Sequence, residues 1–230
     1  MLSHTWPPSF CKNKGCDVKK LGKFTIHGLW PQNTSFPQPN GCTTNYTFKA
    51  EDVCFISIES FIFFLFFWLY CIYFFMTECY IVFLFIYLFV CLFFQLPGNV
   101  STKLKTHWPA MIGNDSDLWV HEWKDHGTCS LLEPVKYFEH ALELYLKPKK
   151  KNIKDFLAKE GIKAGEKPIL TTHIEEAIKK HFDQKIPQIV CDDTKSYLLE
   201  IRICFDKDKP NYRDCSTYTN CNANVTYPYT

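Results

Sequence analysis

The chain has 230 residues and a formal net charge of +2 at pH 7, with 47% hydrophobic and 22% charged residues. This length allows one large domain or two small ones, and the nearly neutral charge does not by itself demand a polyanionic partner. The charge is unevenly distributed, because residues 55–94 contribute only Glu59 and Glu78 and the remainder therefore carries +4.

The N-terminal part predicts one strand and one loop. Lys23–Leu29 is a short apolar run that ends at Trp30-Pro31, which predicts a strand followed by a turn. The proline-rich stretch up to Gly41 predicts a loop. The first six residues are not a secretory signal peptide, because they contain neither a charged n-region nor an apolar h-region.

The segment at about 54–95 differs from everything around it. Thirteen of the 21 phenylalanines lie between Phe55 and Phe94, in a run without Gly, Pro, Lys or Arg. As a membrane segment, its apolar runs Phe61–Met76 and Tyr80–Phe94 are shorter than the ~18 residues of a spanning helix, and positive flanks are absent. As a core segment, it has no polar face. Its residues are mostly those of thymine-rich codons, so we favour a retained intron, with a membrane anchor or hairpin as the alternative.

Helices are predicted in the middle of the chain. Leu118–Lys124 has helical spacing, and Pro134 begins an amphipathic helix whose apolar stripe includes Phe138 and Leu142. Asn152 is a candidate cap for a helix over residues 153–160, which Gly161 would end.

The C-terminal part predicts one helix and a strand pair. Thr172 and Glu175 suggest a capping box for a helix through Phe182. Gln188–Cys191 and Ser196–Phe205 read as paired strands, and the tail from residue 206 reads as a loop held by cysteines. Residues 1–230 without the insertion therefore predict a single α+β domain.

Eight of the twelve cysteines lie outside the apolar segment. Their number is even, their spacing is irregular and none forms a C-x-x-C pair, which favours disulfides in an oxidising compartment over a zinc site. Sequence alone leaves their pairing open. Five N-x-[ST] sequons agree with a secreted glycoprotein; they begin at Asn33, Asn45, Asn99, Asn114 and Asn224.

Two short segments carry the chemistry. They are F-T-I-H-G-L-W-P, which contains His27, and H-E-W-K-D-H-G-T-C, which contains His121, Glu122, Asp125 and His126. On a helix with 100° per residue, these four side chains of the second segment fall within an arc of about 140° and would face one cleft. Because histidine titrates near neutrality, His27 and the second segment together suggest a general acid and a general base.

A zinc site is the main rival interpretation. A metalloprotease helix places two histidines at i and i+4 with the motif H-E-x-x-H, whereas His121 and His126 are separated by five residues. The other alternative is that each histidine is an ordinary core or surface residue, which the presence of both segments in one chain disfavours. We therefore expect no metal and no cofactor.

The two segments resemble the signature motifs of the ribonuclease T2 family, and the chain is most similar to the plant S-RNase and S-like branch. Similarity extends through the segment W-P-P-S-F-C at Trp6 and T-H-W-P at Thr106. The resemblance implies an α+β ribonuclease T2-like domain with an antiparallel sheet core, flanking helices and four disulfides. The implied pairs are Cys11–Cys16, Cys42–Cys129, Cys191–Cys221 and Cys204–Cys215.

The resemblance also implies the reaction and the residue roles. A secreted, monomeric endoribonuclease would cleave single-stranded RNA through the ribose 2′-OH, giving a 2′,3′-cyclic phosphate and then a 3′-phosphate. His126 would be the general base, His27 the general acid, His121 the phosphate ligand and Glu122 an aid to transition-state stabilisation. Trp30 and Gln32 would contact a base; the former would do so by stacking.

Two departures from the family pattern affect these expectations. Position 125 is lysine in the family and Asp125 here, which would repel phosphate and favour protonated imidazoles in the motif. Loss of one such charge typically costs about 10²–10³ in rate, so weakened activity is expected. Only Met1–Thr5 precede Trp6, where the family has an N-terminal strand, so the chain is expected to lack a central strand.

The sequence is compatible with three functions. The first is the secreted RNA endonuclease. The second is a catalytically impaired recognition protein on the same scaffold, of the self-incompatibility type. The third is a membrane-anchored variant that uses residues 54–95.

Overall fold

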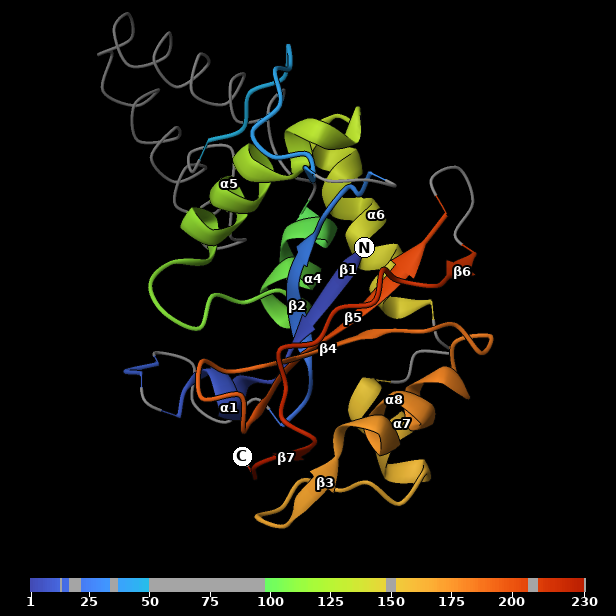
Figure 1. The fold of residues 1–230 in the computed structure, drawn as a ribbon. Helices are drawn as coiled ribbons and strands as arrows, with labels where there is room; N and C mark the ends of the chain where they lie inside the picture. The colour runs from blue at the N-terminus through green and yellow to red at the C-terminus, as the bar shows by residue number, and fades with distance from the viewer. Residues whose placement is uncertain are drawn as a thin grey trace, which may run out of the picture.

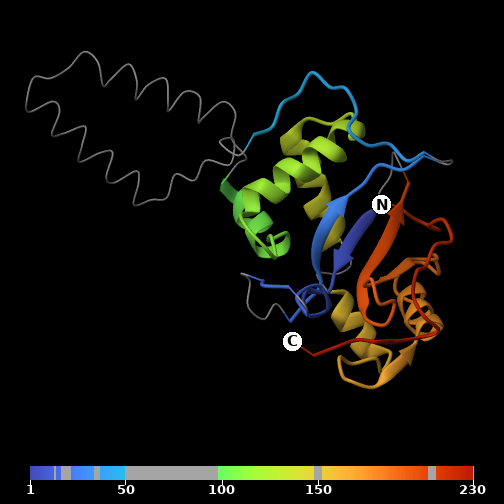
Figure 2. The same ribbon diagram turned by 60° about the vertical axis from the view of Figure 1, so that its left-hand side comes forward.

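The computed structural model describes residues 1–12, 14–16, 22–33, 37–49, 98–147, 152–206 and 211–229. These residues form an α+β fold around an antiparallel sheet (Figures 1 and 2). The sheet has the order β2-β1-β5-β4, and β6 pairs with β5. Its strands are β1 (Leu2–Thr5), β2 (Thr25–Leu29), β4 (Gln188–Cys191), β5 (Leu198–Phe205) and β6 (Tyr212–Arg213). The α+β prediction is confirmed.

The first residues of the chain form a central strand. β1 pairs with β2 on one side and β5 on the other, with Leu2 opposite both Leu29 and Ile203. The expectation that the chain lacks a central strand is therefore wrong. Five residues suffice because β1 is short and all four of its residues are buried.

Helices pack against the sheet at both ends. They are α1 (Pro7–Phe10), α4 (Gly98–His107), α5 (Asp115–Asp125), the 3-10 helix η2 (Gly127–Ser130), α6 (Pro134–Leu146), α7 (Ile153–Lys159) and α8 (Thr171–Lys179). In Figure 1, α4, α5 and α6 lie beside β1 and β2, whereas α7 and α8 lie beside the other end of the sheet. α6 contacts β1 and β2, and α8 contacts β4.

Local sequence signals explain several helix ends. Pro134 occupies the first turn of α6, as predicted, where its missing N–H would have no helical partner. Asn152 caps α7, and Asp155 completes a capping box by accepting the Asn152 backbone N–H at 2.9 Å. Gly161 follows with a φ of +81°, the conformation in which glycine readily ends a helix.

Two predictions for the C-terminal part are corrected. The proposed capping box of Thr172 and Glu175 is wrong, because α8 begins at Thr171 and the N-cap residue is Leu170. Thr171 instead donates its hydroxyl to the carbonyl of Asn222 at 2.7 Å. The tail is also not all loop, since it supplies β6 and the strand β7 (Asn224–Thr226), which pairs with β3 (Pro168–Leu170).

The core consists of two apolar clusters. One joins β1 and β2 to α4, α5 and α6 and contains Trp108, Trp119, Trp123 and Phe138. The other joins β4 and β5 to α7 and α8. Phe205 packs against both clusters, so the two halves share one sheet.

The structure contains the four disulfides that the resemblance implied. They join Cys11 to Cys16, Cys42 to Cys129, Cys191 to Cys221 and Cys204 to Cys215. The asparagines of all five sequons are exposed.

The apolar insertion at 54–95 lies outside the described residues, so the intron and membrane interpretations stay predictions. Among the helices that are described, none is both long and apolar enough to cross a membrane.

Candidate active site

A β-bulge on β2 presents the first histidine. Ser3 lies opposite Gly28 and His4 lies opposite Ile26, so His27 is the extra residue of the bulge. Bulges occur often beside active sites because they redirect a side chain. Here His27 stands on the polar face of the sheet, with 38% of its side chain exposed.

Glu122 and Trp30 connect the two sequence motifs. Glu122 lies on α5 and is 2% exposed, and its Oε2 accepts a hydrogen bond from Trp30 Nε1 at 3.0 Å. Its Oε1 lies 3.9 Å from His27 Nε2. Burial raises the pKa of Glu122, and the positive charge of His27 together with the Trp30 hydrogen bond offsets part of that rise.

Two glycines make this approach possible. A Cβ at Gly28 would collide with Glu122 Oε2 and with the Trp30 indole nitrogen. A Cβ at Gly127 would collide with the ring of Trp123. Each motif therefore places glycine next to histidine because the backbone passes too close to a neighbouring side chain for any other residue.

His27 also contacts a residue that the sequence analysis did not identify. Its Nδ1 lies 2.5 Å from Oε1 of Glu200 on β5. Burial alone would lower the pKa of His27, but the hydrogen bond and charge of Glu200, with the charge of Glu122, raise it above its ordinary value. The protonated imidazole is therefore favoured.

His126 has the opposite tendency. It follows the last residue of α5, with φ −125° and ψ −45°, and its ring centroid lies 5.2 Å from that of Trp30. Burial lowers its pKa to about 4, the charges of His121 and His27 add to that effect, and Asp125 opposes it. Asp125 favours the protonated form of His126, as expected, but desolvation exceeds the attraction of that one carboxylate, so the net shift of the pKa is downward.

The single-arc prediction for the second motif is also corrected. His126 lies outside helical geometry, and the helical residues differ in depth. Glu122 is buried, whereas the His121 side chain is 63% exposed and its Nδ1 lies 3.7 Å from Asp125 Oδ2. Helical spacing defines direction about the axis, but the neighbouring sheet decides which side chains are covered.

Trp30 occupies the centre of the candidate site. Its ring centroid lies 5.2 Å from those of both His27 and His126, and the guanidinium carbon of Arg202 lies 4.8 Å from it. The side-chain amide of Gln32 donates to the carbonyl of Pro31 at 3.1 Å. This hydrogen bond does not connect Gln32 to the residues around Trp30. The role predicted for Gln32 stays a prediction.

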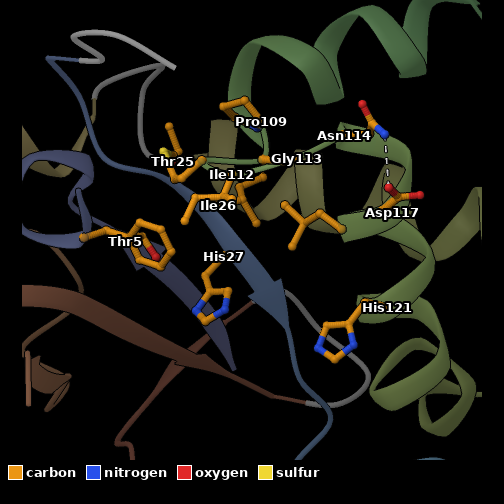
Figure 3. A pocket seen from close by; sticks show the side chains of 14 residues that line it. Thr5, Thr25, Ile26, His27, Pro109, Ile112, Gly113, Asn114, Asp117 and His121 are labelled. Carbon is orange, nitrogen blue, oxygen red and sulfur yellow. Dashed lines mark hydrogen bonds between the residues drawn. The ribbon is translucent and has the colours of Figure 1, made fainter. Parts of the chain in front are cut away.

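A cavity of about 340 Å³ adjoins the histidines. His27 and His121 border it from β2 and α5, as Figure 3 shows. Most of the remaining lining is apolar and comes from Ile26, Met111 and neighbouring residues. A largely apolar cavity with a few polar groups in its lining is the usual form of a small-molecule subsite.

Glu200 and Arg202 are the functional candidates that sequence reasoning missed. Both belong to the predicted strand Ser196–Phe205 and, two residues apart, lie on the same face. The sequence contained one signal for them: an acidic and a basic residue at alternate positions of an otherwise apolar strand. Charged residues are rarely buried without partners, so this pattern indicates a paired site.

The whole-chain comparison identifies the family. Residues 1–215 match the model of the Ribonuclease T2 family, and the protein belongs to that family. The relationship indicates an endoribonuclease.

Curated relatives agree with this placement. Ribonuclease DdI of Dictyostelium discoideum is 26% identical over 98% of this chain and 82% of its own length. The "Ribonuclease-like storage protein" of Panax ginseng is 29% identical over 92% of this chain and 72% of its own length. Further matches include S-ribonucleases of Pyrus pyrifolia.

A solved structure shows the same fold. Ribonuclease MC1 from bitter gourd seeds superimposes with a TM-score of 0.70 at 24% identity, covering 98% of this chain and 97% of the other.

Proposed function

We propose that this protein cleaves single-stranded RNA by transphosphorylation, with His126 as general base and His27 as general acid. The observation that carries the proposal is that both imidazoles lie with their ring centroids 5.2 Å from that of Trp30, in surroundings that shift their pKa values in opposite directions. Paired groups whose environments separate their pKa values in this way are suited to the two roles.

RNA supplies its own nucleophile in this scheme. Neutral His126 accepts the proton of the ribose 2′-OH while the 2′-oxygen attacks phosphorus. His27 donates its proton to the 5′-oxygen as the P–O5′ bond breaks, leaving a 2′,3′-cyclic phosphate. In the second step, His27, now neutral, takes a proton from the water whose oxygen attacks phosphorus, and the protonated His126 gives its proton to the 2′-oxygen as the P–O2′ bond breaks, leaving a 3′-phosphate.

The remaining groups bind and orient the substrate. His121 lines the cavity and is largely exposed, so it would contact the phosphate, and Glu122 favours positive charge on His27. The apolar cavity beside them suits a nucleobase, and it complements the expected stacking on Trp30. Asp125 beside His121 is unfavourable for a phosphate, so the rate is expected to be reduced.

A direct assay tests this proposal. Chain produced with its disulfides formed is incubated with polyuridylate, and products are separated by chromatography beside the His27→Ala and His126→Ala variants. Appearance of a 2′,3′-cyclic intermediate before the 3′-phosphate is expected, with strong loss in both variants. Release of 5′-phosphate products would contradict the mechanism.

We also propose that the protein is a secreted, glycosylated monomer. Four disulfides favour an oxidising compartment, and exposed asparagines in all five sequons are accessible to glycosylation. Expression from plant cells with a secretion signal, followed by glycosidase treatment and gel mobility, tests the glycans. Sedimentation of the same sample tests the oligomeric state.

A catalytically impaired recognition protein on the same scaffold is the second candidate. It is favoured by Asp125, whose carboxylate faces His121 where the family pattern has a lysine. Absence of RNA cleavage at any pH from 4 to 8 with intact folding would favour it.

A further inference from the structure

A carboxylate reaches His27 across the central strand. β2 and β5 are both neighbours of β1, so His27 and Glu200 belong to strands that do not pair with each other. Their side chains nevertheless meet at 2.5 Å on the polar face of the sheet. The strand between them carries Ser3, whose side chain is small enough to lie beneath this contact. The Ser3 hydroxyl donates to Glu200 Oε2 at 3.0 Å.

Glu200 is held from a second direction by its own strand. Arg202 donates to Glu200 Oε2 from Nε at 2.8 Å, and its Nη2 lies 2.7 Å from the same oxygen. The Glu200 side chain is 5% exposed, and the Arg202 guanidinium also covers the Trp30 ring. Each carboxylate oxygen therefore has a partner, as a buried charge requires.

We propose that Glu200 is a positioning residue for His27 and that Arg202 fixes Glu200 in turn. This inference rests on the proposed function, in which His27 is the general acid. Glu200 directs Nδ1 of the imidazole toward the sheet, so that Nε2, 3.9 Å from Glu122, carries the proton to be donated. The arrangement is a carboxylate that orients an imidazole and stabilises its protonated form, a device known from other acid–base enzymes.

Among the described residues, titratable and charged groups from two elements face His27. Glu122 and His121 come from α5, His126 follows it, and Glu200 and Arg202 come from β5. The two carboxylates raise the pKa of His27, whereas Arg202 lowers it. Burial would raise the pKa of Glu200, but the hydrogen bond and charge of His27, together with Arg202, hold it at about 2, so Glu200 stays ionised throughout the assay range.

Glu200 and Arg202 carry opposite charges beside His27, so replacing each one by a neutral residue tests the inference in a different direction. Glu200→Gln keeps a hydrogen-bond acceptor for His27 and removes only the charge. It should lower kcat by about 10- to 100-fold with little change in KM, and it should move the alkaline limb of the kcat/KM profile to lower pH. Arg202→Gln should lower kcat, because Glu200 loses the partner that fixes it, while loss of the positive charge should move the same limb to higher pH.

A matched control exists elsewhere in the chain. Glu160 also accepts from a histidine and a cation, with His181 Nε2 at 3.0 Å and Lys180 Nζ at 2.8 Å. Glu160→Gln removes an equivalent network away from the candidate site and should leave kcat and the pH profile unchanged. The inference is overturned if Glu200→Gln has a normal kcat and its kcat/KM profile keeps the alkaline limb at the wild-type pH.

The remaining outcomes are also decisive. If Glu200→Gln does not fold, an Arg202→Gln variant with normal kcat and an unmoved alkaline limb overturns the inference. If the wild-type chain does not cleave RNA, the proposed function fails, but ¹⁵N NMR titration of His27 still tests the coupling. Loss of the Nδ1–H preference of the neutral ring or a lower His27 titration midpoint in Glu200→Gln supports it, and identical titrations contradict it.

Discussion

The indole Nε1 of Trp30 donates to Oε2 of Glu122 at 3.0 Å, and this bond joins two segments that are 92 positions apart in the chain. The bond brings the strand that carries His27 to the helix that carries His121. Gly28 lies directly beneath it, so the geometry of the candidate site depends on a residue with no side chain.

Gly28→Ala is expected to damage both activity and stability. The added methyl group collides with Glu122 Oε2 and Trp30 Nε1, and relief of such overpacking typically costs about 1–3 kcal/mol. kcat should fall by about ten-fold or more, and Tm should fall with it. Gly15→Ala is the matched control, because a Cβ there meets nothing within 4 Å and should change neither quantity.

The pH dependence of kcat/KM should be bell-shaped. The base His126 must be neutral, so activity should rise as pH increases through about 4. The acid His27 must be protonated, so activity should fall as pH rises through its pKa, which lies above the ordinary value of 6.5. Initial rates on polyuridylate from pH 3 to 9 measure both limbs, and activity that only increases up to pH 9 would contradict these roles.

Asp125→Lys is expected to raise the rate. Asp125 Oδ2 lies 3.7 Å from His121 Nδ1, so a lysine there would bring positive charge to the phosphate site. Because a single charge stabiliser is typically worth about 10²–10³ in rate, an increase of about ten-fold or more is expected. Asp125→Asn separates removal of the negative charge from gain of the positive one and should give an intermediate rate. Equal kcat/KM for all three proteins would refute the importance of this position.

The free energy of unfolding should depend on pH through the protonation of His4. This residue of β1 is 5% exposed, stacks on Tyr145 and has its Nδ1 3.1 Å from the carbonyl of Ile201. Burial lowers the pKa of His4 to about 4, and hydrogen bonds to two backbone groups and the charge of Glu200 offset part of this effect. As pH falls, the unfolded chain therefore binds a proton at this residue near pH 6.5, whereas the folded chain does so only near pH 4. Stability is therefore complete above pH 6.5 and decreases toward pH 4, by about 3 kcal/mol in all.

Urea unfolding at pH 7 and at pH 4.5 measures this effect. His4→Phe preserves the stacking partner for Tyr145 and removes the titrating group, so its stability should change less between the two pH values than that of the wild type. A wild-type protein equally stable at both pH values would rule out the contribution of His4.

Removal of residues 54–95 should leave the fold and activity in place. Phe48 before this segment and Val100 after it are 4% exposed and belong to the same apolar cluster, and Phe48 packs on Phe138 at 5.0 Å. The closure entropy of a connection grows slowly with its length, by about 0.6 kcal/mol for each doubling. Tm and kcat of the shortened chain should match those of the full chain, and sequencing the mature transcript shows which of the two is made.

Local signals were the part of the fold that the sequence predicted well. β2, α5, α6, α7 and the β4–β5 pair lie close to their predicted positions because each has strong periodicity or a recognisable cap. The role of Met1–Thr5 was missed, since a short strand between two others is stabilised by partners about 25 and 200 positions away and not by its own pattern.

The candidate site was predicted in its composition and only partly in its electrostatics. The motifs contain His27, Glu122 and His126, which the structure brings together around Trp30. The protonation preference of His126 depends on desolvation by neighbours from other elements, which a helical projection cannot represent. Glu200 was missed because its contact with His27 crosses a strand that the sequence did not reveal.

The position of β1 has a consequence for the order of folding. Leu2 lies opposite Ile203, so the central strand acquires its second partner only after nearly the whole chain has been synthesised. Contacts of such long range slow folding, and in a nascent chain they are the last to form. The pairing of His27 with Glu200 belongs to the same late group, so an incomplete chain would lack the group that orients its acid.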